Sequence, residues 1–297
     1  MQAIKQIAWA VLLLVAIFIV VGIEVPDLGF AETLKTSDHI SVQKVTRIDD
    51  AKSRVAAMPL VAGFLSGLDQ AILYWINSFV AGHPTQHKII AGMSSNGFFR
   101  GLPIFFMISA LWFSARIDQE RRSRMLAGLM ATCLLTLFSV YLQAHLFWHL
   151  RPLLNPGLHL KVDPEEALSW IGYHGNNSFP SDTTTLYWGL AAVVFLERRR
   201  WGVLAFLWTI FIICIPRVYT GIHYPSDIVA GSMLGSLTLF VGTYLTPAKT
   251  GARKIVRVLS PWPGMLDTSF AVVMADMFNL FEGTRHILKG MVWVLKM

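Results

Sequence analysis

The chain has 297 residues, of which 54% are hydrophobic and only 14% charged, and its formal net charge is +7. Soluble domains carry about 25% charged residues, so this balance argues against an ordinary soluble domain and favours a protein that uses the bilayer as its solvent. The basic residues fall in short clusters between apolar runs, which is typical of loops at a membrane surface and excludes nucleic acid as the expected partner. Cys133 and Cys214 lie inside apolar stretches, so we expect buried thiols rather than metal ligands or a disulfide.

The first apolar run covers residues 7–23 and is long enough to cross a bilayer. We expect an uncleaved span or signal anchor over residues 1–24, with a cleaved signal peptide as the alternative. Residues 25–58 are polar and mixed in charge, which predicts an external segment.

The next stretch, residues 59–81, is apolar but interrupted by Asp69 and Asn77. Its apolar side chains nevertheless recur at helical spacing: Leu68, Ile72, Trp75, Ile76 and Phe79. This pattern predicts an amphipathic helix in the membrane interface rather than a full span. A polar turn is expected over residues 82–88, followed by a small-residue stretch that ends near Arg100.

The clearer apolar runs lie further along the chain, at residues 101–115, 126–147, 184–196, 203–215 and 228–245. Together with the first run they predict six spanning helices. The expected fold is therefore all-α, an integral membrane six-helix bundle with one amphipathic interfacial helix before the core and another at the C-terminus.

Three basic clusters fall on one face if the spans alternate: Arg116, Arg121, Arg122 and Arg124; Arg198, Arg199 and Arg200; Lys249, Arg253, Lys254 and Arg257. The positive-inside rule makes that face cytoplasmic. Residues 151–180 and 216–227 then open on the opposite, periplasmic face of a bacterial inner membrane.

After Pro263 apolar residues again recur at helical spacing, and basic residues follow them. We expect an amphipathic helix on the cytoplasmic leaflet, with a packing or dimerisation helix as the alternative. The predicted organisation is an anchor (residues 1–24), an external segment (25–58), a membrane core (59–246) and a basic cytoplasmic tail (247–297).

Chemistry-bearing side chains gather where this topology predicts a single surface. Arg151 follows one span, and Ser181 begins the next helix. Arg217, His223 and Asp227 surround the start of the last span. Because charged and imidazole groups near membrane depth are costly and usually functional, these residues predict a site.

The residue types at this surface suit phosphate. Guanidinium groups bind phosphoryl oxygens bidentately and neutralise their charge. A hydroxyl where a helix begins, as at Ser181, can hold an anionic oxygen together with backbone N–H groups. His223 and Asp227 are one helical turn apart, so the carboxylate can orient the imidazole and leave its other nitrogen free to attack phosphorus. Pro225 suits the first turn of the helix that carries Asp227.

With these residues the sequence resembles the type 2 phosphatidic acid phosphatase superfamily, which includes lipid phosphatases, acid phosphatases and haloperoxidases. The family motifs are Lys-x6-Arg-Pro, Pro-Ser-Gly-His and Ser-Arg-x5-His-x3-Asp. The resemblance covers roughly residues 68–245 and keeps the order of the motifs and their position relative to the spans. The matching residues are Arg151-Pro152 for the first motif, Pro180-Ser181 for the second, and Arg217, His223 and Asp227 for the third.

The resemblance implies a six-helix core in which His223 attacks the phosphoryl group, forms a phosphohistidine and is oriented by Asp227. It also implies that Arg151, Arg217 and Ser181 bind the phosphate oxygens. It implies no metal ion and no cofactor.

The sequence departs from the family at three positions: the lysine falls at Ala144, the third-motif serine at Pro216, and the second-motif histidine at Thr183. In the family that histidine protonates the leaving oxygen and later helps to activate water, which a threonine hydroxyl cannot do near neutral pH. We assign Thr183 to phosphate binding instead. Arg100 could replace the lysine, although an arginine that snorkels to the interface is the expected role.

Nearby histidines offer a substitute acid. His174, seven residues before Ser181, is a candidate auxiliary acid or base, with an ordinary loop histidine as the alternative. His145 and His149 are one turn apart at a helix end, where we expect interfacial packing rather than a metal pair.

The missing histidine points to the substrate. A lipid diphosphate leaves as a phosphate monoester whose second pKa is about 6, whereas phosphatidic acid leaves as an alkoxide and needs an acid. Because general acid help contributes about 10²–10⁴-fold, its loss favours diphosphates such as a polyprenyl diphosphate, with water or another group as the acceptor.

A catalytically degenerate protein that binds a lipid phosphate, or a scaffold of an envelope lipid or polysaccharide pathway, is the alternative. Retention of His223 and Asp227 argues against it. The spans lack the paired broken helices of a transporter. The expected partners are the lipid substrate and membrane lipids.

Overall fold

The computed structural model describes residues 66–80, 84–114, 118–145, 149–155, 157–162, 177–244 and 246–278. Over these residues the protein is helical, and its extended pairing is one isolated antiparallel bridge between Leu150 and Asn177. The predicted all-α class is therefore confirmed. The predicted N-terminal anchor, the external segment and His174 lie outside the described residues.

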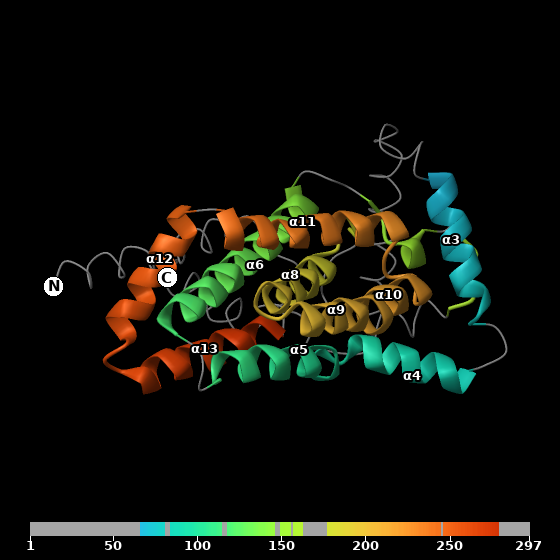
Figure 1. Cartoon of the computed structure of the whole chain (residues 1–297). Helices are drawn as coiled ribbons and strands as arrows, with labels where there is room; N and C mark the ends of the chain where they lie inside the picture. The colour runs from blue at the N-terminus through green and yellow to red at the C-terminus, as the bar shows by residue number, and fades with distance from the viewer. Residues whose placement is uncertain are drawn as a thin grey trace, which may run out of the picture.

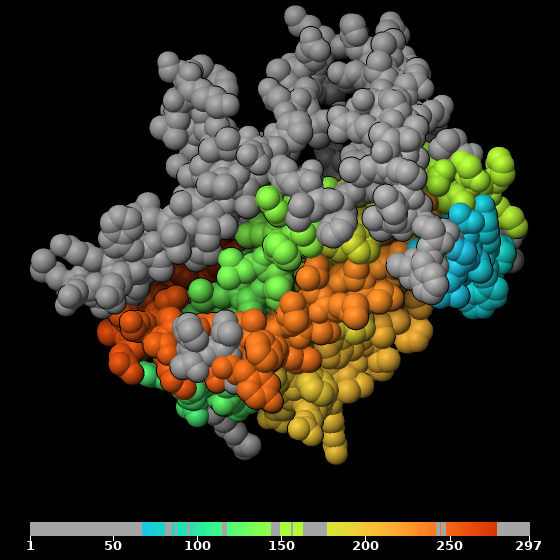
Figure 2. Space-filling view, turned by 90° about the horizontal axis from the view of Figure 1, so that it is seen from above, coloured from blue at the N-terminus to red at the C-terminus, as the bar shows by residue number. Residues whose placement is uncertain are grey.

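Three helices form the centre of the bundle: α6 (Gln119–His145), α8 (Asp182–Glu197) and α11 (Pro225–Tyr244). Helix α8 packs against both of the others and is buried along most of its length (Figure 1). Gly231 and Gly235 let α11 approach α8 closely, because a Cβ at Gly231 would lie 2.5 Å from the carbonyl oxygen of Ser181. Figure 2 shows α11 in orange between α6 in green and the yellow helices that follow α8.

A continuous helical run follows α8 and consists of α9 (Arg199–Trp208), the π-helical segment η2 (Thr209–Cys214) and α10 (Ile215–Tyr219). This run and residues Gln119–Gln143 of α6 are each long and apolar enough to cross a membrane. Phe99–Trp112 and Pro225–Val241 are shorter apolar helices. The described residues thus contain two candidate spans, and the six predicted spans stay a prediction.

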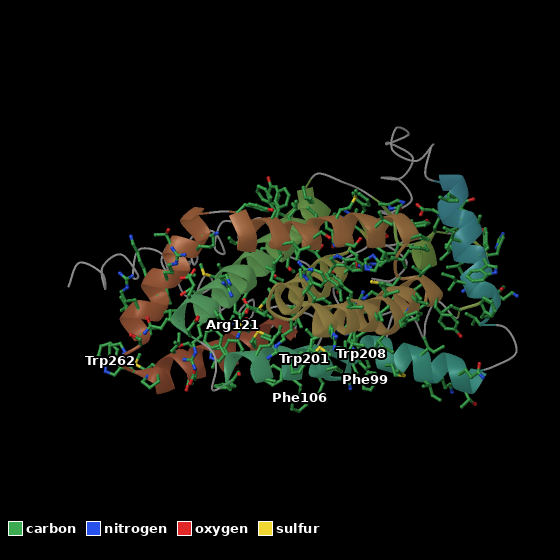
Figure 3. The ribbon with its side chains drawn as sticks, in the orientation of Figure 1. Phe99, Phe106, Arg121, Trp201, Trp208 and Trp262 are labelled. Atoms are coloured by element: carbon green, nitrogen blue, oxygen red, sulfur yellow. The ribbon has the colours of Figure 1, made fainter. Side chains whose placement is uncertain are left out.

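Apolar side chains cover much of the outer surface of these helices. Figure 3 shows Phe99, Phe106, Trp201 and Trp208 along one edge of the bundle, and Phe106 is 62% exposed. Further exposed apolar residues include Leu134, Phe138, Leu204, Phe211, Met233, Leu237 and Phe240. Such a surface suits lipid rather than water, and it supports the expectation of a membrane protein.

Helix α3 (Ser66–Ser78) confirms the helix predicted within residues 59–81. It turns its polar side toward the bundle, where Asp69 and Asn77 are buried, while Leu68 and Trp75 are exposed. Asp69 accepts hydrogen bonds from the backbone N–H of Ser226 at 2.8 Å and from its hydroxyl at 2.5 Å. Asp69, which interrupts the apolar pattern, therefore anchors α3 to the first turn of α11.

The polar turn expected over residues 82–88 is wrong, because α4 (Pro84–Ser95) begins within it. Pro84 stands at the first helical position, where its missing N–H costs nothing. Helix α5 (Gly97–Trp112) follows at once, with the side chain of Asn96 capping its N-terminus.

The basic clusters meet at one end of the bundle. The loops expected there are largely helical: α6 begins at Gln119, and only Arg198 separates α8 from α9. Arg121 and Arg124 bind Glu197 at 3.0 and 3.3 Å. The three basic segments therefore share one end, as the alternating topology predicts.

Helix α12 (Thr246–Leu259) joins this end through Arg253, which contacts Glu120 at 2.6 Å. Helix α13 (Pro263–Phe278) follows, and its interfacial position stays a prediction. Phe270 stacks on Trp112 at 4.3 Å between ring centroids, and Met274 is fully buried. The packing alternative is therefore the one that the structure favours for α13.

Candidate phosphoryl-transfer site

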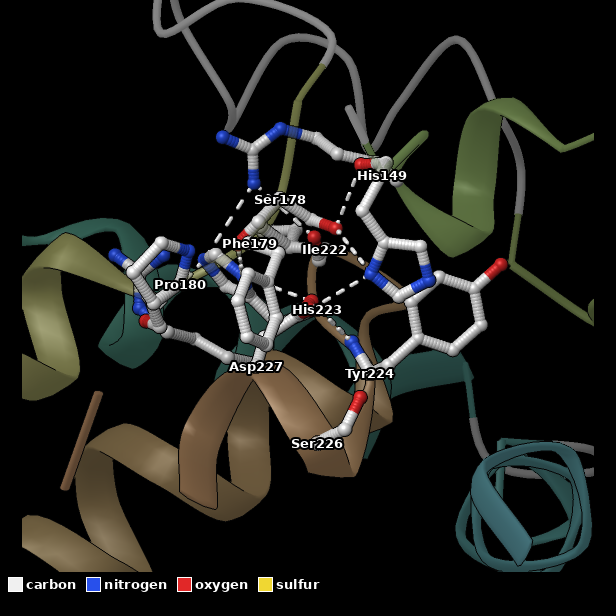
Figure 4. A network of polar contacts seen from close by, with 12 residues as sticks. His149, Ser178, Phe179, Pro180, Ile222, His223, Tyr224, Ser226 and Asp227 are labelled. Carbon is white, nitrogen blue, oxygen red and sulfur yellow. Dashed lines mark hydrogen bonds and ion pairs between the residues drawn. The ribbon is translucent and has the colours of Figure 1, made fainter. Parts of the chain in front are cut away.

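The end of the bundle opposite the basic clusters brings three chain segments together (Figure 4). The segment after α6 pairs with the segment before α8, where the N–H of Ser178 donates to the carbonyl of His149 at 2.8 Å. The N–H of Ser181 donates to the carbonyl of Asp227 at 3.1 Å, which joins the starts of α8 and α11. Gly221 accepts from Leu153, in the short helix η1 (Pro152–Leu154), and its positive φ of 70° suits glycine.

His223 lies at the centre of these segments and is fully buried. Its Nδ1 is 3.0 Å from the carbonyl oxygen of Ser178 and 3.4 Å from Oδ2 of Asp227. Both are acceptors, so Nδ1 carries the proton and Nε2 keeps its lone pair. The carbonyl of Ser178 thus shares with Asp227 the orienting role that the sequence assigns to Asp227 alone. Burial lowers the pKa of His223 to about 4, so the imidazole is neutral near pH 7.

The lone pair on Nε2 faces groups that suit an anion. Nη1 of Arg151 and Oγ of Ser181 each lie 3.5 Å from Nε2 of His223. Arg151 is 3% exposed and is held by the carbonyl of Ile222, to which Nη1 donates at 3.1 Å. Ser181 caps α8, and its Oγ accepts from both the N–H and the hydroxyl of Thr184. Its own hydrogen is therefore left to donate to Nε2 or to a phosphate oxygen.

Asp227 is bound from two sides. The N–H of Tyr224 donates to Oδ2 at 2.8 Å, and Nδ1 of His149 donates to Oδ1 at 2.9 Å. The ring of His149 also stacks on Tyr224, with centroids 4.4 Å apart. The packing role expected for His149 is therefore incomplete, since this residue holds the site carboxylate. Its place two residues before Arg151 in an extended segment was the available signal, because such residues share a side.

Arg217 lies in the last turn of α10, with its Nε buried and without a partner among the described residues. Arg100 lies in the first turn of α5 and is only 7% exposed, so the snorkelling position expected for it is wrong. Its carbonyl accepts from the indole N–H of Trp208 at 2.9 Å, which fixes the backbone of this turn.

Thr183 does not join the groups around His223 in the described contacts. Its hydroxyl and its N–H both donate to Oδ1 of Asp182, at 3.3 and 2.6 Å. Asp182 was not singled out from the sequence, although it stands where the family motif has glycine. Its charge acts on both Arg151 and Arg217. The structure therefore brings Arg151, Ser181, His223 and Asp227 into direct contact, whereas the described hydrogen bonds of Thr183 go to Asp182.

Within the described part of the chain, no three His, Cys, Asp or Glu side chains are grouped to hold a metal ion. The geometry instead offers a neutral imidazole that is backed by acceptors and faced by a guanidinium and a hydroxyl. That arrangement suits nucleophilic attack on a phosphoryl group. The fold and site define a helical protein with apolar, membrane-type helices and a buried histidine centre whose geometry suits phosphoryl transfer.

The comparisons with known proteins agree with this class. Residues 154–250 match the PAP2 superfamily, which confirms the family resemblance predicted from the motifs. The chain is 42% identical over 74 residues to the bacitracin transport permease protein BcrC of Bacillus licheniformis, which covers 24% of this chain and 35% of the relative.

It is also 26% identical over 102 residues to the putative undecaprenyl-diphosphatase YbjG of Escherichia coli K12, which covers 34% of this chain and 47% of the relative. The chain therefore spans less than half the length of these two relatives. No solved structure matches the chain significantly.

Proposed function

We propose that this protein is a membrane lipid-phosphate phosphatase or phosphotransferase that acts on a lipid diphosphate, such as a polyprenyl diphosphate, through a phosphohistidine at His223. The observation that carries the proposal is the orientation of His223. Its protonated Nδ1 contacts Ser178 and Asp227, and its Nε2 faces Arg151 and Ser181.

The reaction follows from this orientation. The lone pair on Nε2 attacks the terminal phosphorus, the bond to the bridging oxygen breaks, and that oxygen leaves with the electron pair. The new phosphoimidazolium carries a positive charge, which Asp227 and the carbonyl of Ser178 stabilise at Nδ1. Water or another acceptor then attacks phosphorus, the P–N bond breaks, and neutral His223 is restored. Arg151 and Ser181 stabilise the phosphoryl oxygens in both steps.

The described contacts provide no general acid for the leaving oxygen, which explains the proposed preference for a diphosphate. In-line transfer places the leaving oxygen on the side of phosphorus opposite Nε2. His149 bonds Asp227 on the Nδ1 side of His223, so it is a positioning residue and cannot protonate that oxygen. The hydroxyl of Thr183 donates to Asp182. A lipid monophosphate leaves without such help, whereas an alkoxide does not. His174 stays a candidate auxiliary acid outside the described residues.

The relatives and the charge pattern support the wider proposal. One relative is named as a putative undecaprenyl-diphosphatase, which fits a lipid diphosphate substrate. The site lies at the end of the bundle opposite the basic clusters, which fits a periplasmic site in a bacterial inner membrane. We keep residues 59–246 as the catalytic membrane core in this proposal.

Phosphate release by the purified full chain tests this function. We expect faster release from a polyprenyl diphosphate than from phosphatidic acid, and we expect His223→Ala to abolish it. Arg253→Ala, at the other end of the bundle, is the control and should release phosphate like the wild type. Equal rates in wild type and His223→Ala would sink the catalytic proposal. Binding of the lipid diphosphate without turnover would instead favour a catalytically degenerate binding protein. This is the second candidate function because the carboxylate of Asp182 acts on the cations Arg151 and Arg217.

A further inference from the structure

Arg100 is a buried cation that the catalytic scheme does not use. It is 7% exposed, and its Nε has no hydrogen-bond partner among the described residues. Its guanidinium lies over the ring of Tyr187, with Cζ 6.0 Å from the ring centroid. A buried charge and an unsatisfied buried N–H both destabilise a fold, so such a group points to an anion that is bound in use.

Arg217 shows the same feature beside it. Its Nε is also buried and unpartnered in the described structure. The positive charges of Arg100 and Arg217 repel each other, and both act on Tyr187. Two neighbouring guanidinium groups of like charge, each with an N–H left over, are an arrangement that an oxyanion between them would satisfy.

The order of these groups in space gives the anion its identity. Arg151 contacts Nε2 of His223 directly, and the charges of both Arg151 and Arg217 act on His223. The positive charge of Arg100 acts on Arg217, and no described contact joins Arg100 to His223. The groups within 3.5 Å of Nε2 of His223 are instead Arg151 and Ser181. If the terminal phosphoryl group binds at His223, Arg100 is available to bind a second anionic group that is joined to the first.

We propose that Arg100 and Arg217 form the subsite for the second phosphate of a lipid diphosphate, while Arg151, Ser181 and His223 hold the terminal phosphoryl group. This inference rests on the proposed function. As the bridging P–O bond breaks, its electron pair moves to the oxygen of the departing lipid monophosphate. Arg100 stabilises that growing charge electrostatically, in place of the proton that the absent histidine would donate. It also supplies the cation that Ala144 cannot.

Arg100→Met tests the subsite, since methionine keeps the length of the apolar stem and removes the charge. For the variant we expect kcat/KM for phosphate release from farnesyl diphosphate to fall about 100-fold and that for farnesyl monophosphate to stay within about threefold. Arg122→Met is the matched control, because Arg122 also lies over an aromatic ring, 5.4 Å from the centroid of Trp112. It should leave both substrates unchanged. An equal loss on both substrates, or no loss, would overturn the subsite.

A binding measurement separates this inference from the proposed function. Inorganic pyrophosphate should raise the Tm of the purified wild type more than inorganic phosphate does, and Arg100→Met should remove that difference. If no substrate releases phosphate but this pattern holds, the proposed function fails and the subsite stands. Equal stabilisation of wild type and variant by pyrophosphate overturns the subsite. If Arg100→Met does not fold, Arg100→Lys keeps the charge and should retain the pyrophosphate effect with only about a tenfold loss on the diphosphate.

Discussion

Gly231→Ala tests whether the contact between α8 and α11 sets the geometry of the site without changing any reacting group. A Cβ at position 231 would lie 2.5 Å from the carbonyl oxygen of Ser181 and 3.0 Å from Cβ of Thr184. Ordinary contact at such positions begins at 3.4 Å. The carbonyl oxygen belongs to the backbone at the start of α8 and cannot rotate away. The two helix starts must therefore separate by about 1 Å, and displacements of about 1 Å at a reacting centre can cost about 100-fold.

The separation would move the hydroxyl of Ser181 away from His223 and Asp227, since Ser181 caps α8 whereas His223 precedes α11 and Asp227 lies in its first turn. We expect kcat/KM for phosphate release from a polyprenyl diphosphate to fall about 100-fold in the purified protein. Overpacking should also lower the free energy of unfolding by about 1–3 kcal/mol, which leaves the helices formed. Steady-state kinetics, circular dichroism and thermal unfolding on the same preparation measure both effects.

Gly251→Ala is the matched control. A Cβ at Gly251 in α12 would meet no atom within 4 Å, and alanine stabilises a helix over glycine by about 0.5–1 kcal/mol. This variant should keep full activity. If Gly231→Ala is folded and stays within about threefold of the wild type, the close helix contact does not set the site geometry and the reasoning is refuted.

Three further perturbations address individual groups of the site. His149→Phe keeps the stack on Tyr224 but removes the hydrogen bond to the Asp227 carboxylate, which is worth about 1.5–3 kcal/mol, so kcat should fall about 10- to 100-fold. His149→Asn restores an N–H donor and should recover most of the lost kcat. Equal kcat in the wild type and both variants would contradict the positioning role. Thr183→His should raise phosphate release from phosphatidic acid relative to the diphosphate by about 10²-fold or more, and an unchanged ratio would show that position 183 is not the lost acid position. Because burial lowers the pKa of His223 to about 4, the neutral form is present above that pH and is lost only below it; histidine NMR titration of the free protein, assigned with His223→Ala, should give a midpoint near that value, and a midpoint above 6 would refute it.

The sequence was sufficient for features that depend on local spacing. His223 and Asp227 were predicted as a pair because they are four residues apart at a helical start, and their Nδ1 and Oδ2 atoms lie 3.4 Å apart; Pro225 begins α11 as expected. The same reasoning could not place helix ends. Residues 199–219 form one run through a π-helical segment, so Arg217 lies inside a helix rather than in a loop.

Contacts between segments that are distant in the chain could not be predicted from the sequence pattern. His223 takes an orienting partner from Ser178, and Asp227 takes one from His149, across 45 and 78 residues of chain. Asp69 was interpreted as an interruption of an apolar helix, whereas it binds Ser226 at the start of α11. In each case the polar residue was visible in the sequence, but its partner depends on how the helices pack.

The departures from the family motifs are consistent with one another when the charged side chains around the site are considered together. The charges of Arg151 and Arg217 act on His223, and that of Arg100 acts on Arg217. Asp182, at the position of the motif glycine, and Asp227 bring two negative charges to these cations. This buried positive charge suits an anionic ligand, which in the proposed scheme is a lipid diphosphate. The same pair of phosphates supplies a leaving group that needs no proton, which removes the demand on Thr183. In the proposed function a diphosphate accounts for the lost histidine and the buried Arg100 together, whereas phosphatidic acid would still need the missing acid.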